Sequence, residues 1–290
     1  MDLGKTLLLG FIAGVTILIG MPLGRMRRPS EALRVTLNAL AIGILMFLVW
    51  DVLSAAWEPI DNGLAQHHES GGHLGPVFGY GVLFALGLTV GLLGLQQYEA
   101  WMGRSLRRAR SRQSLGPGAM ASQELSPRGI AGWSAARQLA LLIAVGIGLH
   151  NFAEGLAIGQ AAAGSEIALA TLLVIGFALH NATEGFGIVA PLAADAEQDP
   201  DARPSWGLLI GLAAIGGGPT FVGTAVGHTF TSEPLAVIFL TLAAGSIIYV
   251  IVQLLAIAGR SSRKDLIYYG VLLGLLAGFA TDAIVTAAGV

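Results

Sequence analysis

Two short stretches carry side chains whose types and spacing could do chemistry: His150–Gly155 reads HNFAEG and His180–Gly185 reads HNATEG. Successive residues of a helix are about 100° apart, so the polar side chains of the first stretch project within roughly a third of its circumference. These side chains are His150, Asn151 and Glu154. The spacing therefore places an imidazole, an amide and a carboxylate on one helix face.

The second stretch repeats the pattern with His180, Asn181 and Glu184. Both stretches lie in long apolar segments, where ionisable side chains are costly and mark a function by default. If the two helices face each other, two imidazoles, two carboxylates and two amides converge. Such nitrogen and oxygen ligands suit Zn²⁺, Fe²⁺, Co²⁺ or Mn²⁺, and the lack of cysteine argues against Cu⁺.

Each of these residues also has a structural alternative. His150 and Glu154 could be a hydrogen-bonded pair that holds helices together, although two copies at corresponding positions favour ligation. Asn151 and Asn181 could bridge helices, or could act as ligands or as supports of the ligands. The sequence favours ligation.

Composition indicates a polytopic membrane protein. Of 290 residues, 54% are hydrophobic and only 12% are charged, and the mean hydropathy is +0.71. Soluble domains carry about 25% charged residues, so a soluble protein is excluded and the lipid bilayer is the expected environment. A formal net charge of −2 gives no indication of a nucleic-acid partner.

The expected fold is an all-α polytopic membrane protein with eight transmembrane helices. Apolar windows separated by charged or Pro-, Gly- and Ser-containing breaks give these candidate spans: residues 4–24, 33–56, 76–102, 136–163, 166–191, 205–230, 234–259 and 265–288. With the N-terminus outside, 15 of the 16 Lys and Arg residues fall in inside segments and only Lys5 lies outside. The positive-inside rule then places both termini on the non-cytoplasmic side, in a bacterial-type inner or plasma membrane.

Two connections stand out. Residues 103–135 are rich in Arg, Ser, Gly and Pro and predict a flexible cytoplasmic loop. The outer loop after the second span contains His67, His68 and His73 among several acids. It could gather metal ions, and a hydrated polar loop is the slightly favoured alternative.

An internal repeat relates the two ends of the chain. The second span reads AIGILMFLVWDVL from Ala41 and the seventh reads AAGSIIYVIVQLL from Ala243; YGVLFALG from Tyr80 and YGVLLGLL from Tyr269 match likewise. Spans one to three thus repeat as six to eight, with the fourth repeating as the fifth. Three spans precede the central pair, so the repeats are inverted in a 3+2+3 arrangement, which is typical of secondary transporters with a site near the midplane.

This reading divides a single transport domain into consecutive parts. They are residues 1–102 with the first three spans, the loop 103–135, residues 136–191 with the two central spans and the metal site, and residues 192–290 with the last three spans.

Eight spans, outside termini, a long cytoplasmic loop after the third span and paired HNxxEG stretches together resemble the ZIP family of divalent-metal transporters. The resemblance implies that metal ions are the transported substrate, that no cofactor is needed, and that the chain forms a homodimer. It also implies which residues are transport-site ligands: His150, Asn151, Glu154, His180, Asn181 and Glu184. In some family members, the two glutamates bridge two metal ions.

The chain departs from the family pattern at three points. Ala153 and Thr183 stand where the family usually has proline before each Glu, which puts the expected helix kinks in doubt. Gly218 precedes Pro219 where many members carry Glu, which favours one metal ion over two. In the seventh span, Gln253 stands where the family commonly has an acidic residue.

Three further residues are candidates for the transport pathway: Met46, Asp51 and His228. Met46 could be a soft contact at the entrance, although methionine in an apolar helix more often packs. Asp51 is expected at a helix end or on the pathway rather than as a ligand, and His228 is more often a packing residue. Asp282, inside the eighth span, should have a partner or water.

The expected function is secondary transport of divalent metal, zinc first, then Fe²⁺, Mn²⁺, Co²⁺ or Cd²⁺, toward the cytoplasm by alternating access. The protein is not expected to be an enzyme. The alternatives are an intramembrane metal-dependent hydrolase, because His and Glu can also activate water, and a metal sensor that does not transport. The inverted repeat favours the transporter, because a hydrolase needs no symmetric half-sites.

Overall fold

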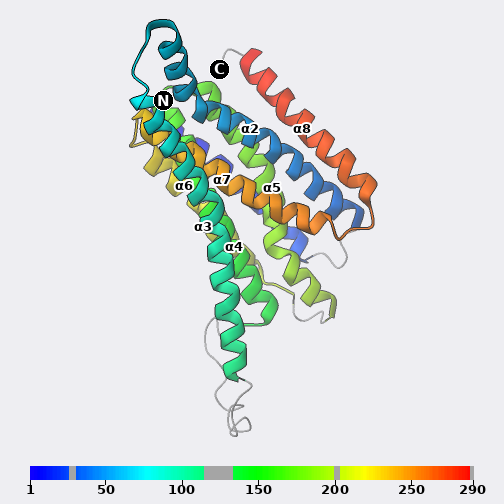
Figure 1. Cartoon of the computed structure of the whole chain (residues 1–290). Coiled ribbons are helices and arrows are strands. Elements are labelled where there is room, and N and C mark those ends of the chain that lie inside the picture. The colour runs from blue at the N-terminus through cyan, green and yellow to red at the C-terminus, as the bar shows by residue number, and fades with distance from the viewer. Residues whose placement is uncertain (26–30, 114–132, 199–202, 288–290) are drawn as a thin grey trace.

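The structure, a computed structural model, describes residues 1–25, 31–113, 133–198 and 203–287. Throughout these residues the chain forms helices and turns and no β-strand (Figure 1). The α-helices are α1 (Leu3–Val15), α2 (Glu31–Ser70), α3 (Gly75–Gln113), α4 (Ala135–Ala163), α5 (Ile167–Gln198), α6 (Trp206–Gly227), α7 (Glu233–Ala258) and α8 (Lys264–Ala287).

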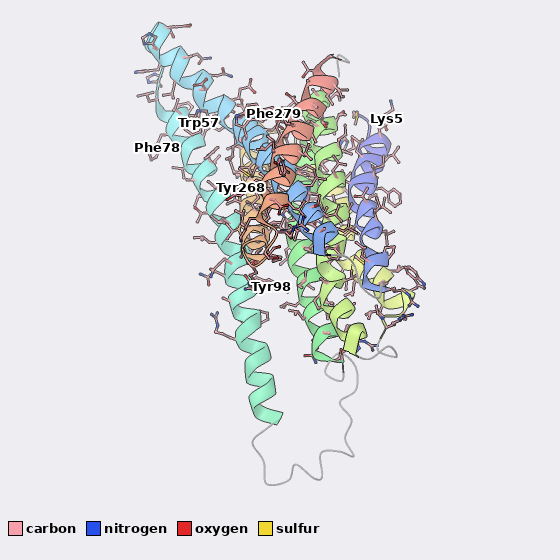
Figure 2. All side chains as sticks on the ribbon, turned by 90° about the vertical axis from the view of Figure 1, so that its right-hand side faces the viewer. Lys5, Trp57, Phe78, Tyr98, Tyr268 and Phe279 are labelled. Carbon is pink, nitrogen blue, oxygen red and sulfur yellow. The ribbon has the colours of Figure 1, made fainter. Side chains whose placement is uncertain are left out.

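Eight helical segments of the described chain are long and apolar enough to cross a membrane, which confirms the predicted all-α polytopic class. The first of them, Leu3–Arg25, joins α1 to two short 3-10 helices, η1 (Thr16–Ile19) and η2 (Met21–Arg25). Both chain ends lie at the same end of the bundle in Figure 1, as an even number of crossings requires. In Figure 2, Lys5 and Phe78 lie toward that end and Tyr98 lies toward the other.

Two helices are longer than the sequence predicts. The residues expected in a loop after the second span continue α2 as far as Ser70, with Pro59 inside the helix. Proline removes one helical hydrogen bond but does not have to end a long helix. The turn comes instead at Gly71, whose φ of 71° is a conformation that glycine adopts without strain.

Helix α3 likewise continues past Gly103 to Gln113, so the predicted loop 103–135 begins as a helix. The stretch after Gly103 is rich in Arg, a strong helix former, and contains no Pro or further Gly up to Gln113. The remainder of the predicted flexible loop, residues 114–132, lies outside the described residues.

The helices pack as two sets. Helices α1, α4, α5 and α6 contact one another, and helices α2, α3, α7 and α8 form a second set through the pairs α3·α7, α2·α8 and α2·α7. Glycines bring helix backbones together within each set, as with Gly91 against Gly245 and Gly43 against Gly274. The sets meet mainly where α4 touches α7 and α2 touches α5. The inverted relation between the repeats stays a prediction.

Candidate metal centre

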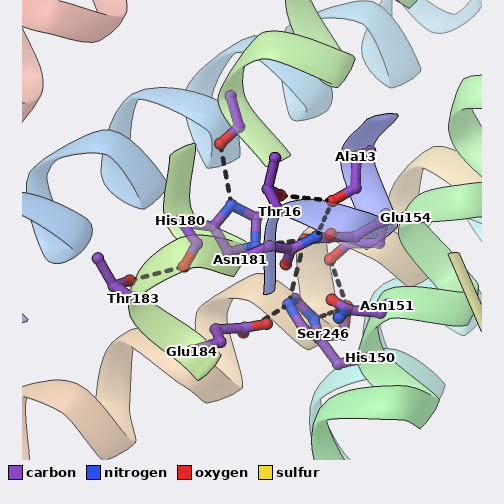
Figure 3. A network of polar contacts seen from close by, with 12 residues as sticks. Ala13, Thr16, His150, Asn151, Glu154, His180, Asn181, Thr183, Glu184 and Ser246 are labelled. Atoms are coloured by element: carbon purple, nitrogen blue, oxygen red, sulfur yellow. Dashed lines mark hydrogen bonds and ion pairs between the residues drawn. The ribbon is translucent and has the colours of Figure 1, made fainter. Parts of the chain in front are cut away.

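The two HNxxEG stretches meet inside the bundle, on the neighbouring helices α4 and α5 (Figure 3). Their six polar side chains are buried, and none exposes more than 6% of its surface. The structure thus brings together all of the predicted side chains: His150, Asn151, Glu154, His180, Asn181 and Glu184.

Each imidazole lies against a carboxylate. Glu154 Oε1 is 3.1 Å from His150 Nε2 and 3.1 Å from His180 Nε2, and Glu184 Oε1 is 3.3 Å from His150 Nε2. One potential ligand atom from each of His150, His180 and Glu184 lies within 4.8 Å of the other two. The stretches therefore interlock around one small space that a single metal ion could occupy.

Hydrogen bonds on the far side of each ring orient the histidines. His180 Nδ1 is 3.1 Å from the Gly176 carbonyl, which can only accept, so Nδ1 carries the proton. His150 Nδ1 is 2.9 Å from the hydroxyl of Ser246, which donates to the Ala243 carbonyl at 2.7 Å and so accepts from the ring. In a neutral histidine, this leaves Nε2 as a lone pair directed at the carboxylates.

The asparagines are oriented by the same principle. Asn151 Nδ2 donates to the Gly216 carbonyl of α6 at 3.0 Å, and Asn181 Nδ2 donates to the Ala13 carbonyl of α1 at 2.9 Å. Ala13 lies in the last turn of α1, where carbonyls lack helical partners. Because the amide nitrogen is used in each case, Oδ1 is left as a free acceptor.

The polar atoms left in this space are acceptors. Within the described chain, hydrogen-bond partners are lacking for both imidazole Nε2 atoms, both asparagine Oδ1 atoms and all four carboxylate oxygens of Glu154 and Glu184. Buried acceptors without a donor are costly, and buried carboxylates are more so. A cation among them, either protons on the imidazoles or a metal ion, offsets that cost.

Close helix packing positions the two stretches. A Cβ added at Gly155 or Gly159 would collide with the backbone of α6, and one added at Gly185 would collide with the backbone of η1. The absence of a side chain at these three glycines allows the helices to approach this closely. Helices α4 and α5 continue without interruption through Ala153 and Thr183, where the family usually has proline.

The other predicted residues lie apart from this cluster. Met46 exposes 43% of its surface, and His228 caps the C-terminal end of α6 with its Nδ1 buried and unpaired within the described structure. Gly218 lines an apolar groove between α1 and α6. Gln253 donates to Glu99 Oε2 of α3 at 2.8 Å, so α3 supplies a carboxylate beside the position where the family has one on α7.

A cavity of about 880 Å³, here called the vestibule, opens between α2, α4, α5, α7 and α8 at the end of the bundle that holds the N-terminus. Asp51 lines it, together with Asp282, whose surroundings the sequence left open. Its carboxylates come from α2, α7, α8 and the connection between α4 and α5: Asp51, Glu58, Glu166, Glu233 and Asp282.

The predicted outer-loop histidines lie elsewhere. His67 and His68 are exposed on the last turn of α2, and His73 follows in the connection to α3. His67 Nδ1 is 2.5 Å from the Gly72 carbonyl, so this ring is part of the local turn. Their metal-gathering role stays a prediction.

Sequence reasoning missed two residues. Ser246 is a lone hydroxyl in an apolar stretch, and its position in the repeat AAGSIIYV was the only signal. Gln160 is 2% exposed in α4 and lines the vestibule, and an amide among small apolar residues could have marked it. Neither sequence feature could predict that Ser246 contacts His150 or that Gln160 lines the vestibule.

Comparison with known proteins supports what the geometry suggests. The profile of the ZIP zinc transporter family matches residues 65–286, which include both HNxxEG stretches. A comparison with individually curated proteins gives no match. Members of the ZIP family are transporters of divalent metal rather than enzymes. With the family match spanning most of its length, this chain belongs to the ZIP zinc transporter family.

Proposed function

We propose that the protein carries divalent metal ions, zinc first and Fe²⁺, Mn²⁺, Co²⁺ or Cd²⁺ as further substrates, toward the cytoplasm through the buried cluster on α4 and α5. One observation carries this proposal: the imidazole, amide and carboxylate atoms that face the cluster are buried acceptors without donors in the described chain. A dication satisfies these acceptors together, whereas protons on two imidazoles satisfy only part of them.

The proposed ligands are His150 and His180 through Nε2, Glu154 and Glu184 through their carboxylates, and the two asparagines through Oδ1. The hydrogen bonds to Ser246 and to backbone carbonyls support this ligand set, because they hold the remaining nitrogen of each side chain away from the metal. A mixed nitrogen and oxygen set can retain water, so it binds a metal ion without trapping it.

Transport would occur by movement of the α1, α4, α5 and α6 set against the α2, α3, α7 and α8 set. The contact between His150 and Ser246 joins the two sets, whereas the glycine contacts of Gly155 and Gly185 lie within one set. Phe177 packs against the His180 ring, Leu240 lines the vestibule, and both belong to one cluster of buried apolar side chains. The six polar side chains of the cluster are buried and are not part of the vestibule lining, so in this proposal the two sets shift before an ion can pass.

The orientation follows from charge. With the vestibule outside, the inside connections hold nearly all Lys and Arg residues, and both termini face away from the cytoplasm of a bacterial-type inner membrane. Arg25, at the opposite end of the first span from Lys5, lies over the Trp206 ring at 5.3 Å and donates to the Pro204 carbonyl. The proposal includes a homodimer, which rests only on the resemblance to the ZIP family.

The test is metal uptake into sealed proteoliposomes that contain a divalent-sensitive dye. His150→Ala and Glu184→Ala should each abolish uptake of the ions that wild type carries, while His68→Ala, on the exposed end of α2, should not. All variants should remain folded by circular dichroism and correctly inserted. Wild-type protein that is folded but moves no metal would overturn the proposal and turn attention to a hydrolase or a sensor.

A further inference from the structure

All of the charged side chains that line the vestibule are negative. Its lining contains five carboxylates and, in the part of the chain that the structure describes, no Lys, Arg or His. Clefts lined by charge of one sign between low-dielectric walls concentrate counter-ions. Charge alone would attract any cation, so a binding site requires a second observation.

That observation is Gln160 of α4. Its side chain is 2% exposed and lines the vestibule, yet its Oε1 has no hydrogen-bond partner among the described residues. Asp51 of α2 lines the same cavity, and its Oδ2 is also buried without a hydrogen-bond partner among the described residues. Unpaired buried acceptors in a native protein call for an explanation, and two of them line the same cavity.

Two further carboxylates of the vestibule lining, those of Glu58 and Glu166, are close enough to repel each other. Glu58 belongs to α2, and Glu166 immediately precedes α5, so they come from the two helix sets that must move relative to each other. Burial, and secondarily the neighbouring Glu58 carboxylate, raise the pKa of Glu166 above its ordinary value. The environment thus disfavours a second negative charge there unless a cation accompanies it.

We propose that the vestibule holds a second divalent-cation site, where oxygen atoms of Asp51, Glu58, Gln160 and Glu166 bind a hydrated ion. The three carboxylates do not offer oxygen atoms within 4.8 Å of one another, so water molecules of the ion bridge to those that do not contact it directly. Carboxylate and amide oxygens are ligands of hard cations such as Mn²⁺, Ca²⁺ and Mg²⁺. Without imidazole, the site discriminates little among dications and releases them readily. Its role as the place where ions gather before transport rests on the proposed function, but the binding itself does not.

The probe is Mn²⁺, whose free form is measured by electron paramagnetic resonance, titrated into the full chain in lipid nanodiscs. Glu154→Gln, which weakens the buried cluster, isolates the vestibule, and Mn²⁺ should still bind to this variant. Adding Glu166→Gln or Glu58→Gln should weaken that binding by about tenfold, as the loss of one carboxylate ligand worth about 1.4 kcal/mol implies. Glu69→Gln, an exposed neighbour on α2 outside the vestibule, is the matched control and should change nothing.

The result that overturns the inference is Mn²⁺ binding that is absent in Glu154→Gln, or that is the same with and without Glu58 and Glu166. If Glu154→Gln does not fold, the titration in wild type decides instead, because Glu166→Gln must then remove the weaker class of sites. Failure of the proposed function is separate: Mn²⁺ bound in the vestibule, with no metal uptake by wild type, leaves this site intact and refutes transport.

Discussion

The buried cluster and the vestibule differ in the side chains that they could offer to a cation. The cluster combines imidazole, amide and carboxylate groups that are at most 6% exposed, and backbone carbonyls and one serine fix the direction of each ring and amide. The vestibule offers carboxylates and one glutamine around about 880 Å³ of open space. One region is organised around ligand direction and the other around charge.

This difference separates two tasks that a single site performs poorly. An open, oxygen-lined cavity attracts dications at long range but distinguishes them weakly, because its attraction depends on the charge of a hydrated ion and little on its identity. A closed set of nitrogen and oxygen ligands distinguishes ions by geometry and ligand type, but it requires dehydration. Phe177, beside His180, and Leu240, in the vestibule lining, belong to one buried apolar cluster that adjoins both regions.

The largest effect should come from removing the carboxylate shared by both histidines. Glu154→Gln keeps the size of the side chain but removes a charge that lies 3.1 Å from each Nε2. We expect metal uptake to fall by about 100-fold or more, as losses of several kcal/mol of ligand interaction imply. Uptake assays in proteoliposomes measure this, and Asp61→Asn on the exposed part of α2 is the charge-matched control. Retained uptake would mean that the cluster is not the transport site.

The second-largest effect should come from filling the close helix contact beside the cluster, whereas an added methyl group beside the vestibule should be tolerated. Gly155→Val places a side chain against the backbone of α6, whereas Gly164→Ala adds a Cβ beside the vestibule with its nearest neighbour at 3.4 Å. We expect Gly155→Val to destabilise the protein by about 1–3 kcal/mol, as overpacking does, and to abolish uptake. Thermal unfolding in detergent should show no such loss for Gly164→Ala, and equal losses would contradict the packing argument.

Ser246 tests whether the cluster depends on ligand direction. Ser246→Ala removes the acceptor of His150 Nδ1–H, so the ring can adopt the other tautomer, and we expect metal affinity to fall by about 10- to 100-fold. Ser246→Thr retains a hydroxyl and should restore most of the affinity. Nitrogen-15 NMR of the imidazoles in the metal-free protein reports the tautomer directly. An unchanged tautomer in Ser246→Ala, or no rescue by threonine, would reduce Ser246 to a packing residue.

The smallest effect should come from salt. Raising the ionic strength toward 0.15 M shortens the Debye length to about 8 Å, which screens the open vestibule much more than the buried cluster. We expect the metal concentration for half-maximal uptake to rise a few-fold while the maximal rate stays the same. The same series with Glu166→Gln should show a weaker dependence on salt. A change confined to the maximal rate would contradict a role of the vestibule in ion capture.

Much of this protein could be predicted from local sequence. Lipid has no water to satisfy backbone groups, so long apolar stretches must be helices, and the eight spans follow from composition. The spacing within HNxxEG places His, Asn and Glu on one helix face, and the duplicated stretch predicted the cluster that the structure brings together. Both results depend only on neighbours within about one helical turn.

The tertiary structure alone decided which partners lie behind and beside those ligands. Ser246 is 96 residues from His150 in the chain, and Ala13 is 168 residues from Asn181, so no periodicity connects them. The continuation of α2 through Pro59 also escaped prediction, because local breakers suggest a loop, whereas packing and favourable helix formers can override one missing hydrogen bond. Helix faces are set by sequence spacing, but the way in which faces meet depends on side-chain packing along their whole length, and that is a property of the assembled bundle.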